Sequence, residues 1–180
     1  MSKPRIDSIR IVVEDDESPD TSYLGVYQDE EQDGVIVVEE GRFLSDLQAE
    51  DPEYSPPERG RDYRFFLPVA GDEKPGTKEY AEYGMQDFEH MQGLNRGDWA
   101  YVGVWAEATV SYPVGNRGDR RLEVLRSGGL WGIESDSKEY IKETAKDELA
   151  DLKEHLQKFG VSTEEFDELS AAALEEYYRN

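Results

Sequence analysis

Residues 99–131 read WAYVGVWAEATVSYPVGNRGDRRLEVLRSGGLW, and this stretch decides the fold. Side chains alternate along residues 99–112 as they do in a long strand. The string PVGNRGD, residues 113–119, has the Pro, Gly and Asn that turns favour. Residues 122–130 then supply a second strand that can pair with the first. The stretch therefore predicts a β-hairpin at the heart of a sheet.

Residues 137–159 have the spacing of an amphipathic helix that packs on this sheet. Gly160 ends the helix, and Asp136 with Glu139 can cap its start. Its expected buried face consists of Ile141, Ala145, Leu149, Leu152, Leu156 and Phe159.

A last helix is expected to begin at the capping box from Ser162 to Glu165. It presents Phe166, Leu169, Ala173 and Tyr177 along one face. Residues 137–180 therefore predict a C-terminal helical hairpin.

The first hundred residues predict shorter elements. Residues 6–13 are rich in β-branched side chains and indicate a strand, and residues 23–27 and 63–67 indicate two more. Residues 35–38 form a further strand or begin a short helix with Phe43, Leu44 and Leu47. Prolines make residues 50–61 a loop, and near-helical apolar spacing predicts one internal helix over residues 80–94.

These elements predict an α+β fold with an antiparallel or mixed sheet around the central hairpin. At 180 residues the chain fits a single domain, 1–180. An acidic, loop-rich insert is expected at about residues 28–62.

The net charge of −22 is unevenly distributed, since residues 14–62 carry −14 and residues 134–180 carry −8, whereas residues 63–133 carry only −2. Direct binding to nucleic acid is not expected, because that requires clustered Lys and Arg. The chain has no cysteine and no apolar stretch of membrane-spanning length. We therefore expect a cytoplasmic location and no membrane partner.

The string DEEQDGVIVVEE at residues 29–40 is close to an EF-hand calcium loop, with Asp29, Asp33 and Glu40 at three ligand positions. It departs from that pattern at Glu31, where Asp or Asn is usual, and the preceding residues form a poor helix. An acidic loop in solvent before a strand is the alternative interpretation.

The string SGGLWGIESDS at residues 127–137 could cradle a phosphate with its glycines at the start of a helix. Because Glu134 and Asp136 would repel a phosphate, we favour a tight bend in which Trp131 is buried in the core. The repeated NRGD strings at residues 95–98 and 116–119 are interpreted as turns.

Catalytic motifs are absent from the sequence. The two histidines, His90 and His155, fall on or beside polar helix faces, and there is no nucleophile elbow or P-loop. We therefore name no catalytic residue and no cofactor.

Four strings resemble an uncharacterised protein family of phage, prophage and plasmid-like genomes. They are PDTSYLGVY, YRFFLPV, YGMQDFEHMQGLNRGDWAYVGVWAEATV and SGGLWGIESDSKEYIKETAKDELADLKEHL. The resemblance covers most of residues 19–160, is most specific in NRGDW and GGLWGIESDS, and departs most at 28–62. It implies an accessory role in a mobile element, such as host takeover or evasion of defence, and no known activity.

The favoured hypothesis is a non-enzymatic acidic interaction protein that binds a basic host or phage protein, with DNA mimicry as one form of such binding. Its acidic surface is expected to come from residues 15–33 and from the outer face of the 137–159 helix. The alternatives are an enzyme acting on a small molecule and a calcium-binding module. The partner-binding candidates are Asp15, Asp16, Glu143, Asp147 and Glu154.

Overall fold

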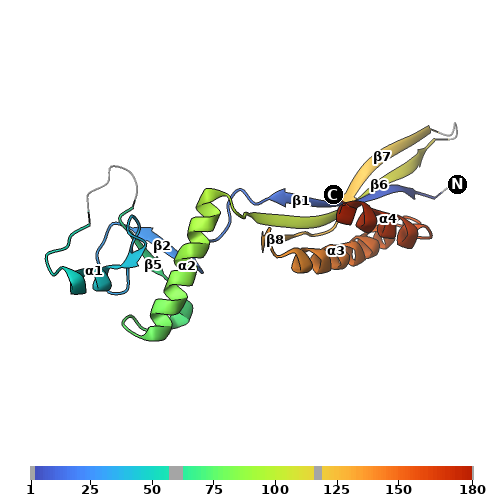
Figure 1. Ribbon diagram of the computed structural model, residues 1–180. Helices are drawn as coiled ribbons and strands as arrows, with labels where there is room; N and C mark the ends of the chain where they lie inside the picture. The colour runs from blue at the N-terminus through green and yellow to red at the C-terminus, as the bar shows by residue number, and fades with distance from the viewer. Residues whose placement is uncertain (1–2, 57–62, 116–118, 180) are drawn as a thin grey trace. The chain divides into compact units, whose positions relative to one another are not determined.

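The computed structural model describes residues 3–56, 63–115 and 119–179. It divides the chain into two compact units, where the sequence analysis expects one domain with an insert. Unit 1 combines Met1–Pro19 with Ala100–Asn180, and unit 2 is Asp20–Trp99 (Figure 1).

Unit 1 is built on a four-stranded antiparallel sheet around the long strand β6 (Tyr101–Val114). Strand β1 (Arg5–Asp15) pairs with β6 on one side. On the other side, β7 (Asp119–Arg126) and β8 (Leu130–Glu134) pair with its two halves. The β6–β7 hairpin confirms the central hairpin expected from the sequence.

The second strand of that hairpin differs from the expectation, because residues 122–130 are not continuous. The chain leaves β7 after Arg126 and enters β8 at Leu130. Gly129 has a φ of 79°, outside the extended region. Between the strands, the Ser127 backbone N–H donates to the Ala106 carbonyl at 3.0 Å, and the Ser127 hydroxyl accepts a hydrogen bond from the Ala106 N–H at 2.9 Å.

Two helices cover one face of this sheet, namely α3 (Lys138–Lys158) and α4 (Phe166–Arg179). Figure 1 shows α3 running along the strands. The even-numbered residues of β6 pack against these helices, because alternate side chains of a strand point to one face. Their buried partners on α3 are Ile141, Ala145, Leu149, Leu152 and Leu156.

The helical hairpin is confirmed, but three details of its ends differ. Phe159 is 63% exposed because it is the C-cap residue, where the backbone has left the helix and the helical face no longer continues. The N-cap is Ser137 rather than Asp136, and its side chain makes no capping hydrogen bond. Helix α4 starts at Phe166 rather than at Ser162, because Ser162 bridges to Arg5 at the start of β1.

Unit 2 holds a second antiparallel sheet of short strands in the order β2 (Gly25–Gln28), β5 (Phe65–Pro68), β3 (Ile36–Val37) and β4 (Arg42–Phe43). Helix α1 (Leu44–Glu50) follows β4 directly, so residues 35–50 contain both a strand and a short helix. This segment supplies buried apolar side chains, so much of the expected insert belongs to a core that contains Val35, Val37, Leu44, Leu47 and Phe65.

Helix α2 (Lys78–Arg96) is the internal helix, and it packs on the sheet of unit 2 through Phe88, whose ring lies 5.6 Å from that of Phe66. Thr77 caps its start by accepting a hydrogen bond from the Tyr80 N–H at 3.1 Å. Gly97 ends it in a left-handed conformation. The first NRGD string thus forms a helix end and turn, whereas residues 116–118 of the second lie outside the described residues.

A left-handed turn, η1 (Ala70–Asp72), connects β5 to α2. All three of its residues have positive φ, namely 52° at Ala70, 62° at Gly71 and 66° at Asp72. Only Gly adopts this conformation without cost. The Ala70 N–H donates to the Asp87 carboxylate on α2 at 2.7 Å, which fixes the turn against the helix.

Candidate functional site

Four acidic residues of α3 form a continuous line on its solvent face, and three of them, Glu143, Asp147 and Glu154, are the candidates predicted from the sequence. Glu143, Asp147, Asp151 and Glu154 are all exposed and follow one another at steps of four, four and three residues. Such steps keep side chains on one side of a helix. We call these four residues the acidic stripe. The apolar face of α3, which packs on β6, points the other way.

Two of the five lysines of α3 pair with carboxylates outside the stripe. Lys142 contacts Glu139 at 2.7 Å, and Lys153 contacts Asp167 of α4 at 2.7 Å. The hydrogen bond and charge of Lys142 lower the pKa of Glu139. Within the stripe, Glu154 has Lys158 at 3.6 Å. Among the described residues, the other three acids of the stripe form no ion pair and are exposed to solvent.

The other partner-binding candidates, Asp15 and Asp16, lie at the end of β1 in unit 1. Asp15 is opposite Val102 at the start of β6, and Val102 packs in the same cluster as Ile141 near the start of α3. The Asp16 carboxylate accepts a hydrogen bond from the Ser18 N–H at 3.0 Å. These two residues are thus at the same end of unit 1 as the beginning of α3. The rest of the expected acidic segment, residues 20–33, belongs to unit 2.

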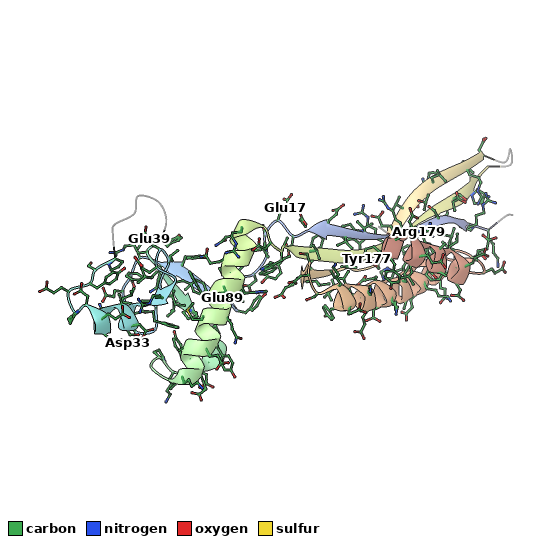
Figure 2. All side chains as sticks on the ribbon, viewed as in Figure 1. Glu17, Asp33, Glu39, Glu89, Tyr177 and Arg179 are labelled. Atoms are coloured by element: carbon green, nitrogen blue, oxygen red, sulfur yellow. The ribbon has the colours of Figure 1, made fainter. Side chains whose placement is uncertain are left out.

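The calcium candidates are not brought together. Strand β3 lies inside the would-be loop, and β2 takes the place of its first helix. Asp29 accepts from the Arg64 N–H at 3.3 Å, and Glu31 accepts from Gln48 at 3.3 Å. Figure 2 shows Asp33 and Glu39, the neighbour of Glu40, well apart in unit 2. Within the described residues, no three His, Cys, Asp or Glu side chains are grouped to hold a metal ion.

Trp131 is half exposed, at 50%, so the expectation that it is buried was wrong. It lies on the sheet face away from the helices and covers Gly103 of β6. A Cβ built at Gly103 would be 2.5 and 2.6 Å from Cδ2 and Cζ3 of the Trp131 ring. Trp105 stacks beside it, with ring centroids 5.5 Å apart and planes at 28°. Trp131 therefore replaces the side chain that Gly103 lacks, as an aromatic residue over a sheet glycine does.

Glu107, which the sequence did not single out, lies on this same face of the sheet. Its side chain is only 2% exposed. One carboxylate oxygen accepts from the Trp105 indole N–H at 3.0 Å and contacts Arg126 at 2.7 Å. The other accepts from Arg10 at 2.6 Å. The glutamate thus holds two exposed arginines from the strands on either side of β6.

The environment of Glu107 changes its ionisation. Burial raises the pKa of this carboxyl, but hydrogen bonds from Trp105 and Arg10 and the charges of Arg10 and Arg126 outweigh burial and lower the pKa. Glu107 is therefore a carboxylate held by its partners. The sequence signal for a buried acid was a single glutamate in VGVWAEATV, where the other residues are apolar or small.

The glycine string at residues 127–129 is tied to α3 by a carboxylate. Glu148, which is buried on the helix, accepts a hydrogen bond from the Gly129 N–H at 2.9 Å. In a phosphate-binding loop this N–H would donate to the phosphate, but here it already donates to the Glu148 carboxylate. The loop thus forms a strand-to-strand bend rather than a phosphate cradle.

A shallow cavity of about 250 Å³ opens beside this bend. It is lined by Glu14, Trp105, Arg126, Trp131 and residues 127–129. Glu14 faces it because Glu14 pairs with Gly103 across β1 and β6, and opposite residues share a face. A larger cavity of about 380 Å³ lies in unit 2 near the start of α2, where Tyr80 donates to the Gly34 carbonyl at 3.0 Å.

Each of the two histidines contacts a neighbouring group of the fold. His90 stacks on Trp99 with ring centroids 4.2 Å apart, and the Nδ1 atom of His155 lies 3.1 Å from the Arg126 carbonyl. Neither residue lines the cavity beside Trp131.

No protein-family model, curated protein or solved structure matches this chain. Among the helices in the described part of the chain, none combines the length and the apolar character needed to cross a membrane.

Proposed function

We propose that this chain is a non-enzymatic interaction protein whose acidic stripe on α3 binds a basic protein. The observation that supports the proposal is the alignment of Glu143, Asp147, Asp151 and Glu154 on one exposed helix face. Of these four acids, Glu154 forms an ion pair with Lys158, and the other three form none among the described residues. Like charges held in a row attract clustered Lys and Arg side chains of a partner.

The net charge of −22 adds a long-range contribution. It raises the rate at which a basic partner meets the protein, and salt weakens it because the Debye length falls to about 8 Å at 0.15 M. The setting that we propose is the cytoplasm of a cell carrying a mobile element, in keeping with the resemblance described above. There the basic partner is a protein of the host or of the phage.

DNA mimicry is not required for this function. Neighbouring acids of the stripe are about 6 Å apart along the helix at a rise of about 1.5 Å per residue. B-DNA presents one charge per about 1.7 Å of its axis. A basic protein surface of moderate charge density is therefore a better match than a deep DNA-binding cleft.

The test compares two triple charge reversals that change the net charge equally. The first, Glu143→Lys with Asp147→Lys and Glu154→Lys, alters the stripe. The second, Glu79→Lys with Glu82→Lys and Glu89→Lys, alters exposed acids of α2 in unit 2. Binding of a nine-residue lysine peptide is measured by calorimetry at 50 and 150 mM salt, together with the melting temperature of each variant.

We expect the stripe variant to lose at least about tenfold in affinity, and the α2 variant to lose much less. Equal losses in both variants would show that only the net charge matters and would overturn the proposal. Once a natural partner is captured from a host lysate, the same pair of variants is to be compared on it.

A further inference from the structure

The exposed face of Trp131 is available to a ligand. Three ring atoms of Trp131 lie within the space of a Cβ at Gly103, so one face of the indole rests on β6. The ring is nevertheless half exposed, so its opposite face is open to solvent. An aromatic face attracts a cation placed within about 6 Å of the ring centre.

One carboxylate beside this ring is open to a cation. Glu14 is exposed, lines the cavity with Trp131 and has no ion-pair partner among the described residues. Arg126 also lines the cavity, but its guanidinium is engaged by Glu107 at 2.7 Å and lies over the Trp105 ring, 5.8 Å from its centroid. Glu14 is therefore the carboxylate of the cavity wall that remains open to a further cation.

The cavity volume and its surroundings indicate a side chain of a peptide rather than a whole small molecule. A space of about 250 Å³ accommodates one long side chain. Val124 and Leu122 of β7 are opposite Thr109 and Ser111, so they lie on the same sheet face as Trp105 and Glu107. Both are more than half exposed. They offer apolar contacts to the residues that would flank such a side chain.

We propose that this cavity binds the side chain of an arginine in a peptide segment of a protein partner. The planar guanidinium stacks on the open face of Trp131 and forms two hydrogen bonds to the Glu14 carboxylate. Arginine is preferred to lysine because a guanidinium stacks on aromatic rings and matches a carboxylate with two parallel donors. This site is on the sheet face opposite α3, so it is separate from the acidic stripe.

The probes are two capped pentapeptides, Gly-Gly-Arg-Gly-Gly and its lysine counterpart, titrated into the full chain. The indole N–H signals in a nitrogen–proton correlation spectrum report binding, and Trp131→Phe assigns the signal of Trp131. We expect the arginine peptide to shift that signal and to bind more tightly than the lysine peptide. Glu14→Gln should weaken its binding by about 1.4- to 5-fold, the range for the loss of an exposed ion pair.

Glu168→Gln on α4 is the matched control, since it removes one exposed carboxylate from the same unit, outside the acidic stripe, and should leave arginine-peptide binding unchanged. Trp131→Ala should abolish the preference for arginine, and Glu14→Gln tests the site without changing the aromatic pair. Equal binding of the two peptides, or insensitivity to both variants, would overturn the proposal. So would binding of free arginine amide as tight as that of the peptide, or a shift of Trp131 by a Gly-Gly-Glu-Gly-Gly peptide instead.

Discussion

The indole ring of Trp131 lies on Gly103, so the aromatic side chain of β8 occupies the space that any larger residue of β6 would need. This contact joins two strands on the open face of unit 1. It also presents one half of the ring to solvent. The size of one residue on β6 thus determines whether the candidate site beside Trp131 exists.

Replacing Gly103 with Ala should displace Trp131 without removing it. The added methyl group would overlap the ring, and such overpacking costs about 1 to 3 kcal/mol. We expect a red-shifted tryptophan emission and a lower free energy of unfolding in urea. Gly128→Ala is the matched control in the adjoining bend, because a Cβ at Gly128 meets no atom within 4 Å. If Gly103→Ala and Gly128→Ala leave emission equally unchanged, Trp131 does not rest on Gly103 in solution.

Truncating Trp131 should cost less than truncating a core residue. Because half of its surface remains in water, we expect Trp131→Ala to lower the free energy of unfolding by about 1 to 2 kcal/mol. Leu152→Ala, at a fully buried position, should cost about 2 to 5 kcal/mol. Urea denaturation of both variants checks the order. A larger loss for Trp131→Ala than for Leu152→Ala would mean that the ring is a core residue after all.

Glu107 should make unit 1 sensitive to acid. Its folded-state pKa is lowered because hydrogen bonds from Trp105 and Arg10 and the two arginine charges outweigh the effect of burial. Because the pKa of Glu107 is lower in the folded state, the ionised carboxylate stabilises the fold. This stabilisation is present above the unfolded pKa of about 4.3 and is lost as the pH falls through the folded pKa. Glu107→Gln should therefore cost about 1 to 3 kcal/mol at pH 7 and flatten the acid part of the stability curve.

Denaturation midpoints between pH 7 and pH 3 provide this measurement for Glu107. Glu123→Gln on β7 is the control, since it removes an acid from the same sheet at a less buried position. The same acid slope in wild type and Glu107→Gln would show that the carboxylate does not stabilise the fold.

The sequence predicted the architecture well where a strand or helix was long enough for its hydrophobic pattern to repeat several times. Strand β6 and helix α3 each extend over more than ten residues, so alternation or helical spacing identified them. The short strands β3 and β4 have two residues each, which is too few for a period. They form because β3 pairs with β5, β4 pairs with β3, and their residues bury a common core. The pairing with β5 is not local in the sequence.

The candidate site was predicted only in part. The acids of α3 could be placed on an outer face, because helical spacing separates them from Ile141 and Leu149. Trp131 was misplaced because a glycine beside an aromatic residue is compatible with a buried bend and with an exposed ring. Which one forms depends on Gly103, 28 residues earlier in the chain, and on its register with β8. Glu148 could have been noticed as an acid on the apolar face of α3.

Asp87 should show the opposite pH dependence to Glu107. Burial raises the pKa of Asp87, and the hydrogen bond from the Ala70 N–H and the charge of His90 only partly offset this effect. Because the pKa of Asp87 is higher in the folded state, protonation of this carboxyl stabilises the fold. This stabilisation is complete below the unfolded pKa of about 3.9 and is lost as the pH rises through the folded pKa. At pH 7 the buried negative charge therefore costs stability, although its oxygen holds the left-handed turn at Ala70.

Two substitutions separate the charge of Asp87 from its hydrogen bond. Asp87→Asn keeps an oxygen that can accept from the Ala70 N–H and removes the charge, so it should leave the stability at pH 7 unchanged or raise it. Asp87→Ala leaves that N–H without a partner in a strained turn and should cost about 1 to 3 kcal/mol. Melting temperatures of both variants at pH 4 and pH 7 test this order. If Asp87→Asn is as destabilising as Asp87→Ala at pH 7, the turn requires the negative charge, and burial is not the dominant influence on this carboxylate.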